Sequence, residues 1–223
     1  MKKNLLYFVL IFYIAYLVTV WYKMEEINNF LKPLLIPMLI TYTATRFYFS
    51  GKGTLIKALV MSTLGDVLLL FSDVHQLFFI SGLISFLIAH IIYIRLFLRK
   101  LNPSFNFNWA FITLVFLGIY LFFFLATMWG NLKMMKIPVT IYALVISTML
   151  FVAIQLVVSK TLRKGEYVLF GALLFVTSDS LLAWNMFYNE INNGSFWVMS
   201  TYLFAHLFIV YGLVNSKKKK GKE

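Results

Sequence analysis

The chain has 223 residues, of which 61% are hydrophobic and only 13% are charged, and its mean hydropathy is +0.85. This composition excludes a soluble globular domain and predicts a polytopic membrane protein. In so apolar a chain, the formal charge of +12 indicates basic cytoplasmic loops in contact with anionic headgroups rather than binding of nucleic acid. The sequence has no cysteine, which excludes thiol nucleophiles, disulfides and cysteine-ligated zinc.

Apolar runs separated by short polar segments predict an all-α fold, a bundle of eight transmembrane helices. Each run is close to the about 20 residues with which a helix crosses a bilayer. The first run follows Lys2 and Lys3 but has no small-residue cleavage site after it, so we expect an uncleaved helix. Residues 25–29 are expected to form a polar loop. The predicted helices cover residues 5–21, 31–49, 54–72, 77–97, 109–129, 136–159, 166–187 and 196–214.

The positive charges predict the orientation of these helices. Of the 20 Lys and Arg residues, 16 fall on the side of the N-terminus, including Arg46 and the lysines of the C-terminal tail. Both termini are therefore expected in the cytoplasm, with the protein in a bacterial inner membrane. We expect a single domain over residues 1–216 and a basic, lipid-attracted tail over residues 217–223.

Scarce polar residues suggest an internal repeat of four helices plus four, with both halves oriented in parallel because four is an even number. The third and seventh predicted helices each carry an aspartate before a pair of leucines, and the fourth and eighth each carry an Ala-His pair. The matching segments are GDVLL (65–69) with SDSLL (178–182), FLIAH (86–90) with YLFAH (202–206), and Lys32-Pro33 with Lys136-Ile137-Pro138.

Asp66 and Asp179 are the carboxylates that lie well inside predicted spans. A charge at that depth costs about 2.5 to 3.5 kcal/mol on insertion scales, so each aspartate is a functional candidate by default. Two buried carboxylates can divide the roles of general acid and general base. The alternative is that each is a hydrogen-bonded carboxylate that only joins helices.

Other polar residues inside the spans are candidates for the same site. His90, with Tyr93 on the same helical face, can relay protons or orient an aspartate, and His206 is its counterpart in the last helix. Ser178 and Asn185 can line a polar cavity, and Lys32 can receive a phosphate. For each of these residues a structural role stays open: hydrogen bonds between helices for the histidines, Ser178 and Asn185, and contact with headgroups for Lys32.

Several catalytic motifs are absent from the sequence. It has no His-Glu-x-x-His, no Gly-x-Ser-x-Gly and no glycine-rich phosphate loop. No pair of histidines or carboxylates has the i, i+4 spacing of a metal site on a helix. We therefore expect no metal and no cofactor.

Four motifs, in order along nearly the whole chain, make it resemble the YhhN family of membrane proteins, whose animal members are lysoplasmalogenases. The resemblance implies eight helices and hydrolysis of the vinyl ether of a lysoplasmalogen, giving a fatty aldehyde and glycerophosphoethanolamine or glycerophosphocholine. Its partners would then be a lysophospholipid substrate and membrane lipids. The motifs are Lys32-Pro33, GDVLL (65–69), GLISFLIAHIIY (82–93) and GALLFVTSD (171–179).

The candidate residues fit that implied chemistry. Protonation of a vinyl ether at carbon creates an oxocarbenium ion that water attacks, so Asp66 and Asp179 are expected to act as acid and base, much as carboxylate pairs do for glycosides. His90 and Tyr93 would hold the water or orient an aspartate, and Lys32 would meet the phosphate. Two other classes of function stay open: a proton-coupled lipid or ion transporter that uses the paired aspartates, and a non-catalytic scaffold.

Overall fold

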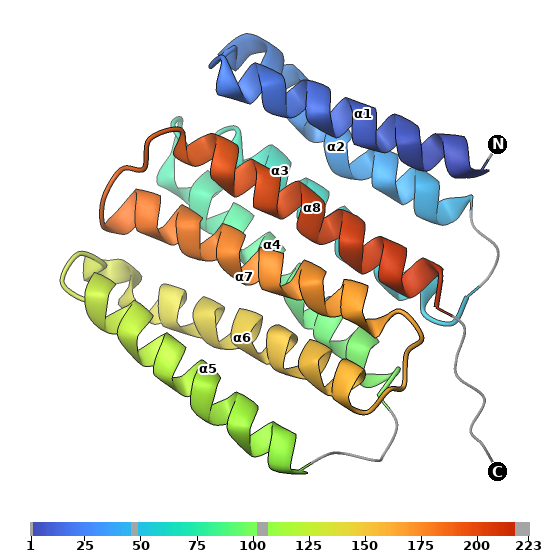
Figure 1. Ribbon diagram of the computed structural model, residues 1–223. Helices are drawn as coiled ribbons and strands as arrows, with labels where there is room; N and C mark the ends of the chain where they lie inside the picture. Colours follow the sequence, from blue (N-terminus) through green and yellow to red (C-terminus); the bar gives the residue numbers. More distant parts are fainter. Residues whose placement is uncertain (1, 46–48, 102–106, 217–223) are drawn as a thin grey trace, which may run out of the picture. The chain divides into compact units, whose positions relative to one another are not determined.

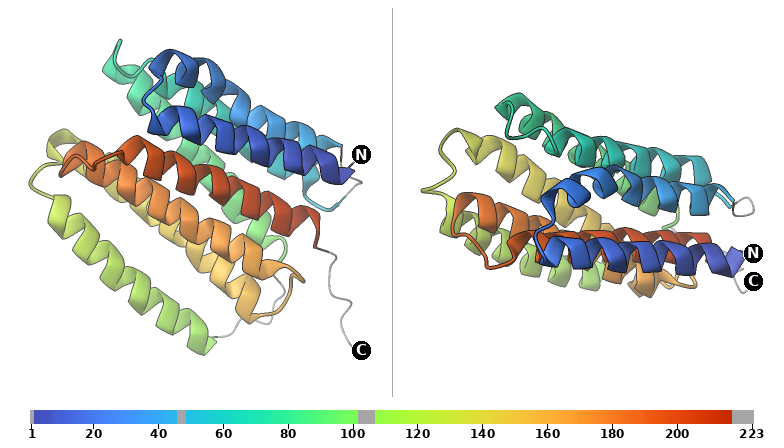
Figure 2. Two further views of the ribbon diagram at one scale, coloured as in Figure 1. Left: turned by 45° about the horizontal axis from the view of Figure 1, so that its top comes forward. Right: turned by 90° about the horizontal axis from the view of Figure 1, so that it is seen from above.

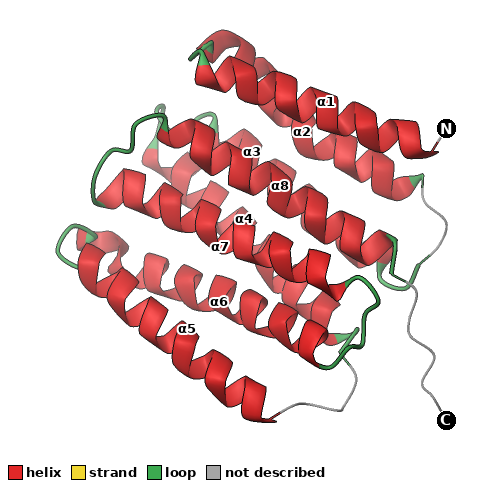
Figure 3. Ribbon diagram, in the orientation of Figure 1, coloured by secondary structure: helices red, strands yellow, loops and turns green. Residues whose placement is uncertain are grey.

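The computed structural model of the chain describes residues 2–45, 49–101 and 107–216. Within these ranges the chain forms eight α-helices and one short 3₁₀ helix, and none of the described residues is in a strand (Figure 3). The predicted all-α class and the count of eight helices are therefore confirmed. Arg46 and the predicted tail over residues 217–223 lie outside the described residues. The elements are α1 (Lys2–Trp21), α2 (Glu25–Ala44), α3 (Lys52–Leu69), α4 (Gln76–Leu98), α5 (Phe107–Met128), η1 (Lys133–Met135), α6 (Lys136–Val158), α7 (Gly165–Phe187) and α8 (Gly194–Val214).

Five of the described helices, α4 to α8, are long and apolar enough to cross a membrane. Each has at least 21 residues, which at about 1.5 Å per residue spans a hydrocarbon core of about 30 Å. The chain is thus a multi-pass membrane protein. That α1, α2 and α3 also cross the bilayer stays a prediction.

The second helix differs from the sequence prediction. It begins at Glu25 and ends at Ala44, so the expected polar loop over residues 25–29 is wrong. Glu25 and Glu26 lie in its first turn, where carboxylates interact favourably with the helix dipole. The hydroxyl of Thr19 in α1 donates to Asn28 Oδ1 at 2.7 Å, so Asn28 is bonded to the preceding helix.

The third helix begins and ends earlier than the sequence suggested. Gly51 precedes it with a φ of 92°, a left-handed conformation that glycine adopts without strain. The ammonium of Lys52 donates to the carbonyl of Ala44 at 2.6 Å and closes the connection from α2. Because α3 ends at Leu69, Asp66 lies in the last turn of the helix rather than in the interior of a longer run.

The chain divides into two compact units, Met1–Tyr93 and Ile94–Glu223. The first unit holds α1, α2, α3 and most of α4. Its third and fourth helices pack closely, because the ring of Phe86 lies where a side chain at Gly65 would begin, 2.7 Å from an ideal Cβ. The hydroxyl of Ser85 in α4 also donates to the carbonyl of Met61 in α3 at 2.8 Å. That the chain forms a single domain over 1–216 stays a prediction.

The second unit holds α5 to α8, which lie side by side in chain order (Figure 1). Its closest pair is α7 and α8, which lie side by side and antiparallel in Figure 1 and in the left view of Figure 2. A Cβ at Gly171 would lie 2.7 Å from the carbonyl oxygen of Ala205, and one at Gly212 would lie 2.7 Å from Val168 Cγ2. Small residues at these crossings let the two backbones approach, as in many membrane helix pairs.

Candidate functional site

Asp179 of α7 accepts a hydrogen bond in the second unit. The phenol of Tyr142 in α6 donates to Asp179 Oδ2 at 2.9 Å. The carboxylate is half-buried, and the hydrogen bond ties α6 to α7 at this level. Because the phenol donates to one carboxyl oxygen, Tyr142 holds Asp179 in one orientation.

A second pair of hydroxyls lies next to this carboxylate. Tyr120 Oη of α5 and Ser180 Oγ are 2.6 Å apart, and the Ser180 hydroxyl also bonds to the carbonyl of Val176. Asp179 acts electrostatically on Tyr120. Hydroxyl groups of three helices are thus bonded to Asp179 or to the residue next to it, an arrangement suited to holding a proton or a water molecule.

Asp66 of α3 is the corresponding carboxylate of the first unit, and it is only 2% exposed. It acts electrostatically on the phenols of Tyr13 and Tyr16, which lie one turn apart on α1. Tyr13 is itself fixed, because its hydroxyl donates to the carbonyl of Leu35 in α2 at 3.2 Å. In each unit, therefore, an aspartate interacts with tyrosines of other helices, through a hydrogen bond from Tyr142 in the second unit and electrostatically with Tyr13 and Tyr16 in the first.

These tyrosines are the residues that the sequence analysis missed. Tyrosine in a membrane protein is most often placed at the interface with water, which conceals those that lie deeper. Tyr13, Tyr120 and Tyr142 each lie at least six residues from either end of their helices. A tyrosine at such depth needs a hydrogen-bond partner, and that depth was the available signal.

The two histidines do not lie level with the aspartates of their own units. In the first unit, the contacts of Met61 with Ser85 and of Gly65 with Gly82 put Asp66 level with residue 81 of α4. His90 lies nine residues further, about 13 Å along the helix at 1.5 Å per residue. The expectation that His90 orients Asp66 is therefore not favoured by this register. The side chain of His90 is itself buried within the first unit.

The second unit repeats this register. The hydroxyl of Ser178 donates to the carbonyl of Val198 at 3.0 Å, and Gly171 faces Ala205, so Asp179 lies level with residue 197 of α8. His206 is again nine residues further, about 13 Å along the axis. The same separation of aspartate and histidine thus occurs in both units.

His206 is fully buried in an aromatic cluster. Its ring meets those of Phe175 and Tyr202 edge to face, with centroids 4.7 Å away in each case. The rings of Phe175 and Tyr202 also meet each other at 5.8 Å. This packing holds α7 against α8 and accounts for a histidine in an apolar helix without a catalytic role.

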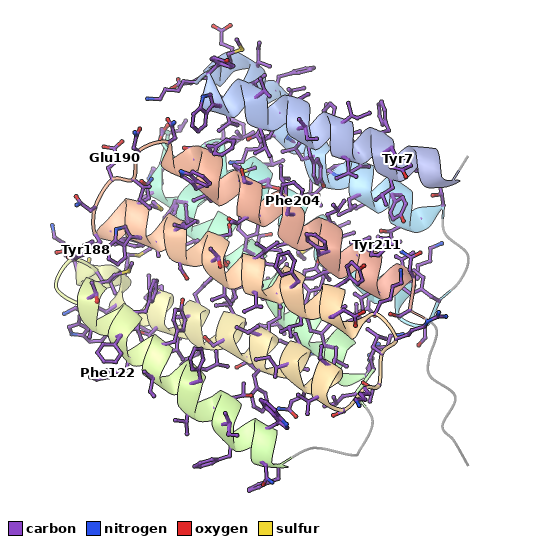
Figure 4. All side chains as sticks on the ribbon, in the orientation of Figure 1. Tyr7, Phe122, Tyr188, Glu190, Phe204 and Tyr211 are labelled. Atoms are coloured by element: carbon purple, nitrogen blue, oxygen red, sulfur yellow. The ribbon has the colours of Figure 1, made fainter. Side chains whose placement is uncertain are left out.

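The two polar residues of α7 that were expected to line a cavity, Ser178 and Asn185, both bond within the α7–α8 hairpin. Ser178 reaches Val198, as described above, and Asn185 Oδ1 accepts the backbone N–H of Ile191 at 2.8 Å. The loop also brings Gly194 so close that a Cβ there would lie 2.7 Å from Asn185 Oδ1. Figure 4 shows this turn of the chain, with Tyr188 and Glu190 labelled. These bonds match the structural alternative for both residues.

Lys32 and Tyr93 both belong to the first unit. Lys32 is half-buried on α2. The connection between α2 and α3 joins Ala44 to Lys52, and it gives a common reference for depth. Lys32 lies 12 residues before Ala44, and Asp66 lies 14 residues after Lys52. At 1.5 Å per residue both lie about 20 Å from that end of the helix pair, at similar depth. Tyr93 is fully buried, and the phenol of Tyr13 acts on it electrostatically.

Comparisons with known proteins give the chain its family. The sequence profile of the YhhN family matches residues 27–213. The chain belongs to the YhhN family. The match includes both aspartates and both histidines described above, together with every helix after α1 except the first two residues of α2 and the last residue of α8. Among the residues that the structure describes, this YhhN protein has no group of three or more His, Cys, Asp or Glu that could hold a metal ion.

Three animal relatives of this YhhN protein carry the name lysoplasmalogenase TMEM86B. The protein of Sus scrofa is 30% identical over 164 residues, and that of Homo sapiens is 30% identical over 166 residues. Each alignment covers 73% of this chain and 64% of the relative, so the chain spans less than two thirds of their length. The Mus musculus protein is 32% identical over 154 residues, which is 69% of this chain and 60% of that protein. The comparison with solved structures gave no significant match.

Proposed function

We propose that this YhhN protein is a membrane hydrolase that cleaves the vinyl ether of a lysoplasmalogen, releasing a fatty aldehyde and a glycerophospho-headgroup. The observation that carries the proposal is its similarity to relatives named lysoplasmalogenase over more than two thirds of the chain. The hydroxyl-surrounded carboxylates of the two units support it, because vinyl ether hydrolysis needs acid–base groups and no cofactor.

The reaction divides into three balanced steps. An acid transfers a proton to the outer carbon of the C=C bond, and the ether oxygen then shares the positive charge of the oxocarbenium ion. A base takes a proton from water as the water oxygen bonds to the inner carbon, which gives a hemiacetal. Loss of the glycerol oxygen with a proton leaves the aldehyde, so one water molecule is consumed overall.

Asp66 and Asp179 are our candidates for the acid and the base. Each is prepared within its own unit, Asp179 by the phenol of Tyr142 and Asp66 by the nearby phenols of α1. Such preorganised hydroxyls can steady a water molecule and the developing cation without large rearrangement.

The proposal gives Lys32 the role of meeting the substrate phosphate. Its depth is similar to that of Asp66, as a lysophospholipid requires, because the vinyl ether lies only a few bonds from the phosphate. Tyr93 is proposed as a contact of the substrate in the same unit. Substrate binding by Ser178, Asn185 and His206 stays a prediction, because their described contacts are already explained by the packing of α7 against α8.

A catalytic role for His90 also stays a prediction, and it has its own test. His90→Gln keeps a side chain that can form hydrogen bonds and removes the titrating imidazole. A loss of kcat of about tenfold or more, the lower part of the range for acid–base groups, would support a role in proton transfer. Activity within about twofold of wild type would remove His90 from the mechanism.

The central test is release of aldehyde by purified protein. Lysoplasmalogen is added in detergent, and mass spectrometry follows the aldehyde for wild type, Asp66→Asn and Asp179→Asn. Glu190→Gln, a change of an exposed carboxylate in the α7–α8 loop, is the matched control. Aldehyde from wild type and the control, with a loss of at least about a hundredfold in both aspartate variants, supports the proposal. Full activity in either folded aspartate variant overturns the assignment of that residue.

The repeated register favours one second candidate, a proton-coupled carrier of lipids or ions built from two parallel four-helix halves. Gly65 faces Gly82 in the first unit, and the residues that match them in the repeat, Ser178 and Val198, are bonded in the second. Reconstituted liposomes separate the two functions. A carrier moves its substrate unchanged together with protons, whereas a hydrolase yields aldehyde without a proton gradient.

We also propose that both termini are cytoplasmic and that the protein resides in a bacterial inner membrane. Because the sequence has no cysteine, single cysteines can be introduced without background. A cysteine at Asn189 in the α7–α8 loop is expected to react with an impermeant thiol reagent in intact cells. One at Lys160, in the loop before α7, is expected to react only after the membrane is opened. The reverse pattern would overturn the orientation.

A further inference from the structure

The loop that leads into α7 holds a lysine in an unusual environment. Lys164 is half-buried, although it lies in a basic loop whose other cations, Lys160 and Arg163, are exposed. Its backbone N–H donates to the hydroxyl oxygen of Ser216 at 3.1 Å, and Ser216 lies just beyond the end of α8. The backbone of α8 passes close by, since a Cβ at Gly212 would lie 3.1 Å from the Lys164 carbonyl oxygen.

The ammonium of Lys164 is held by two tyrosines. Nζ donates to Tyr211 Oη at 2.9 Å and lies 4.4 Å from the centroid of that ring and 5.4 Å from the ring of Tyr167. The two rings lie 5.0 Å apart. Tyr211 is labelled toward the C-terminal end of α8 in Figure 4. We call these three residues the lysine–tyrosine corner.

This corner keeps its capacity to bind an anion. A lysine ammonium has three donors, and the described contacts use one of them on Tyr211. The nearest carboxylate in sequence, Glu166, is only two residues away, a spacing that turns side chains to different faces of a helix. The cation–π contacts fix the position of the ammonium without neutralising it.

From this geometry we propose that the lysine–tyrosine corner binds the phosphodiester of an anionic phospholipid of the surrounding bilayer. The corner lies at one end of α7 and α8, where headgroups meet a membrane protein, and Lys160 and Arg163 add positive charge around it. The exposed ring of Phe170 packs edge to face on Phe208 at 4.9 Å and offers an aromatic surface to the acyl chains.

The corner is distinct from the proposed catalytic residues. Asp179 is 15 residues further along α7, a separation of about 22 Å at 1.5 Å per residue. The phosphate of a lysophospholipid held at Lys164 could not bring a vinyl ether only a few bonds away to that carboxylate. The lipid bound here is therefore a second lipid and not the substrate, so this proposal does not depend on the hydrolase activity.

The test is a lipid titration of the full chain followed by native mass spectrometry. Wild type in detergent is expected to bind one phosphatidylglycerol more tightly than phosphatidylcholine. Lys164→Gln should weaken the phosphatidylglycerol affinity about fivefold, because one lysine near a headgroup contributes about that factor. Lys160→Gln removes the same charge from the same loop, at an exposed side chain, and should change the affinity less than about twofold.

Three results would overturn the proposal: no loss in folded Lys164→Gln, equal losses in both variants, or complete displacement of the lipid by about 10 mM inorganic phosphate. Equal losses would mean general attraction by charge, and displacement would mean a site for a free anion. If Lys164→Gln does not fold, Tyr211→Phe keeps the ring and removes the hydroxyl. That variant is expected to bind phosphatidylglycerol about two- to fivefold more weakly, and unchanged binding would contradict the site.

Discussion

The phenol of Tyr142 donates to the carboxylate of Asp179 at 2.9 Å, across the contact of α6 with α7. Neither residue is near the other in sequence, and only Asp179 stood out before the fold was known. The bond gives this carboxylate a fixed direction in a part of the chain where water is scarce. It is therefore the contact through which the proposed chemistry can be tested most sharply.

Tyr142→Phe removes this hydroxyl and keeps the ring. A hydrogen bond contributes about 0.5 to 1.5 kcal/mol between neutral groups and up to about 3 kcal/mol to a charged group, so we expect aldehyde release to fall by about twofold to a hundredfold in kcat. KM should change little, because Tyr142 acts by positioning Asp179. Steady-state kinetics with lysoplasmalogen measures both constants. Tyr188→Phe, at an exposed tyrosine at the end of α7, is the control and should keep wild-type kinetics.

His206→Gln tests whether the aromatic cluster of α7 and α8 is structural. The substitution loses two edge-to-face ring contacts, each worth about 0.5 to 1.5 kcal/mol. We expect a Tm lower by several degrees in detergent, with activity per folded molecule within about threefold of wild type. A loss of kcat at unchanged Tm would instead assign the imidazole to catalysis.

Gly171→Ala tests the close approach of α7 and α8. The added methyl would lie 2.7 Å from the Ala205 carbonyl and 2.9 Å from the backbone nitrogen of Ile209, so one helix must shift. Overpacking of this kind costs about 1 to 3 kcal/mol, and thermal unfolding should show a clear decrease of Tm.

Gly118→Ala is the matched control for that substitution. Gly118 lies inside α5, and an ideal Cβ at this position would have no neighbour within 4 Å, so alanine should leave Tm unchanged or raise it slightly through helix propensity. Equal changes of Tm in the two variants would mean that the helix pair is looser than described.

Isotopic solvent tests the chemistry of the proposed reaction. Protonation at carbon places one solvent hydrogen on the carbon next to the aldehyde, so turnover in D₂O should give aldehyde with a single non-exchanging deuterium at early times. Mass spectrometry after rapid reduction to the alcohol reads this label. Aldehyde without deuterium would exclude protonation of the vinyl ether as the first step.

The sequence alone determined the class of the protein, the eight helices and most of their bounds. Apolar runs of about 20 residues have few alternatives in a bilayer, because every backbone group must be bonded within the chain. It failed at residues 25–29, where polarity suggested a loop, because carboxylates also stabilise the first turn of a helix. Asp66 and Asp179 became candidates because a charge within an apolar run is rare.

Only the tertiary structure decided which groups those aspartates meet. Tyr13, Tyr120 and Tyr142 approach the carboxylates from other helices, and spacing along one helix cannot reveal a contact between two. The packing of α3 on α4 and of α7 on α8 likewise decided the depth of the histidines. Each histidine lies nine residues along its helix from the position level with the aspartate of the same unit. A periodic pattern gives the face on which a residue lies, but its depth relative to a neighbouring helix depends on how the two helices pack.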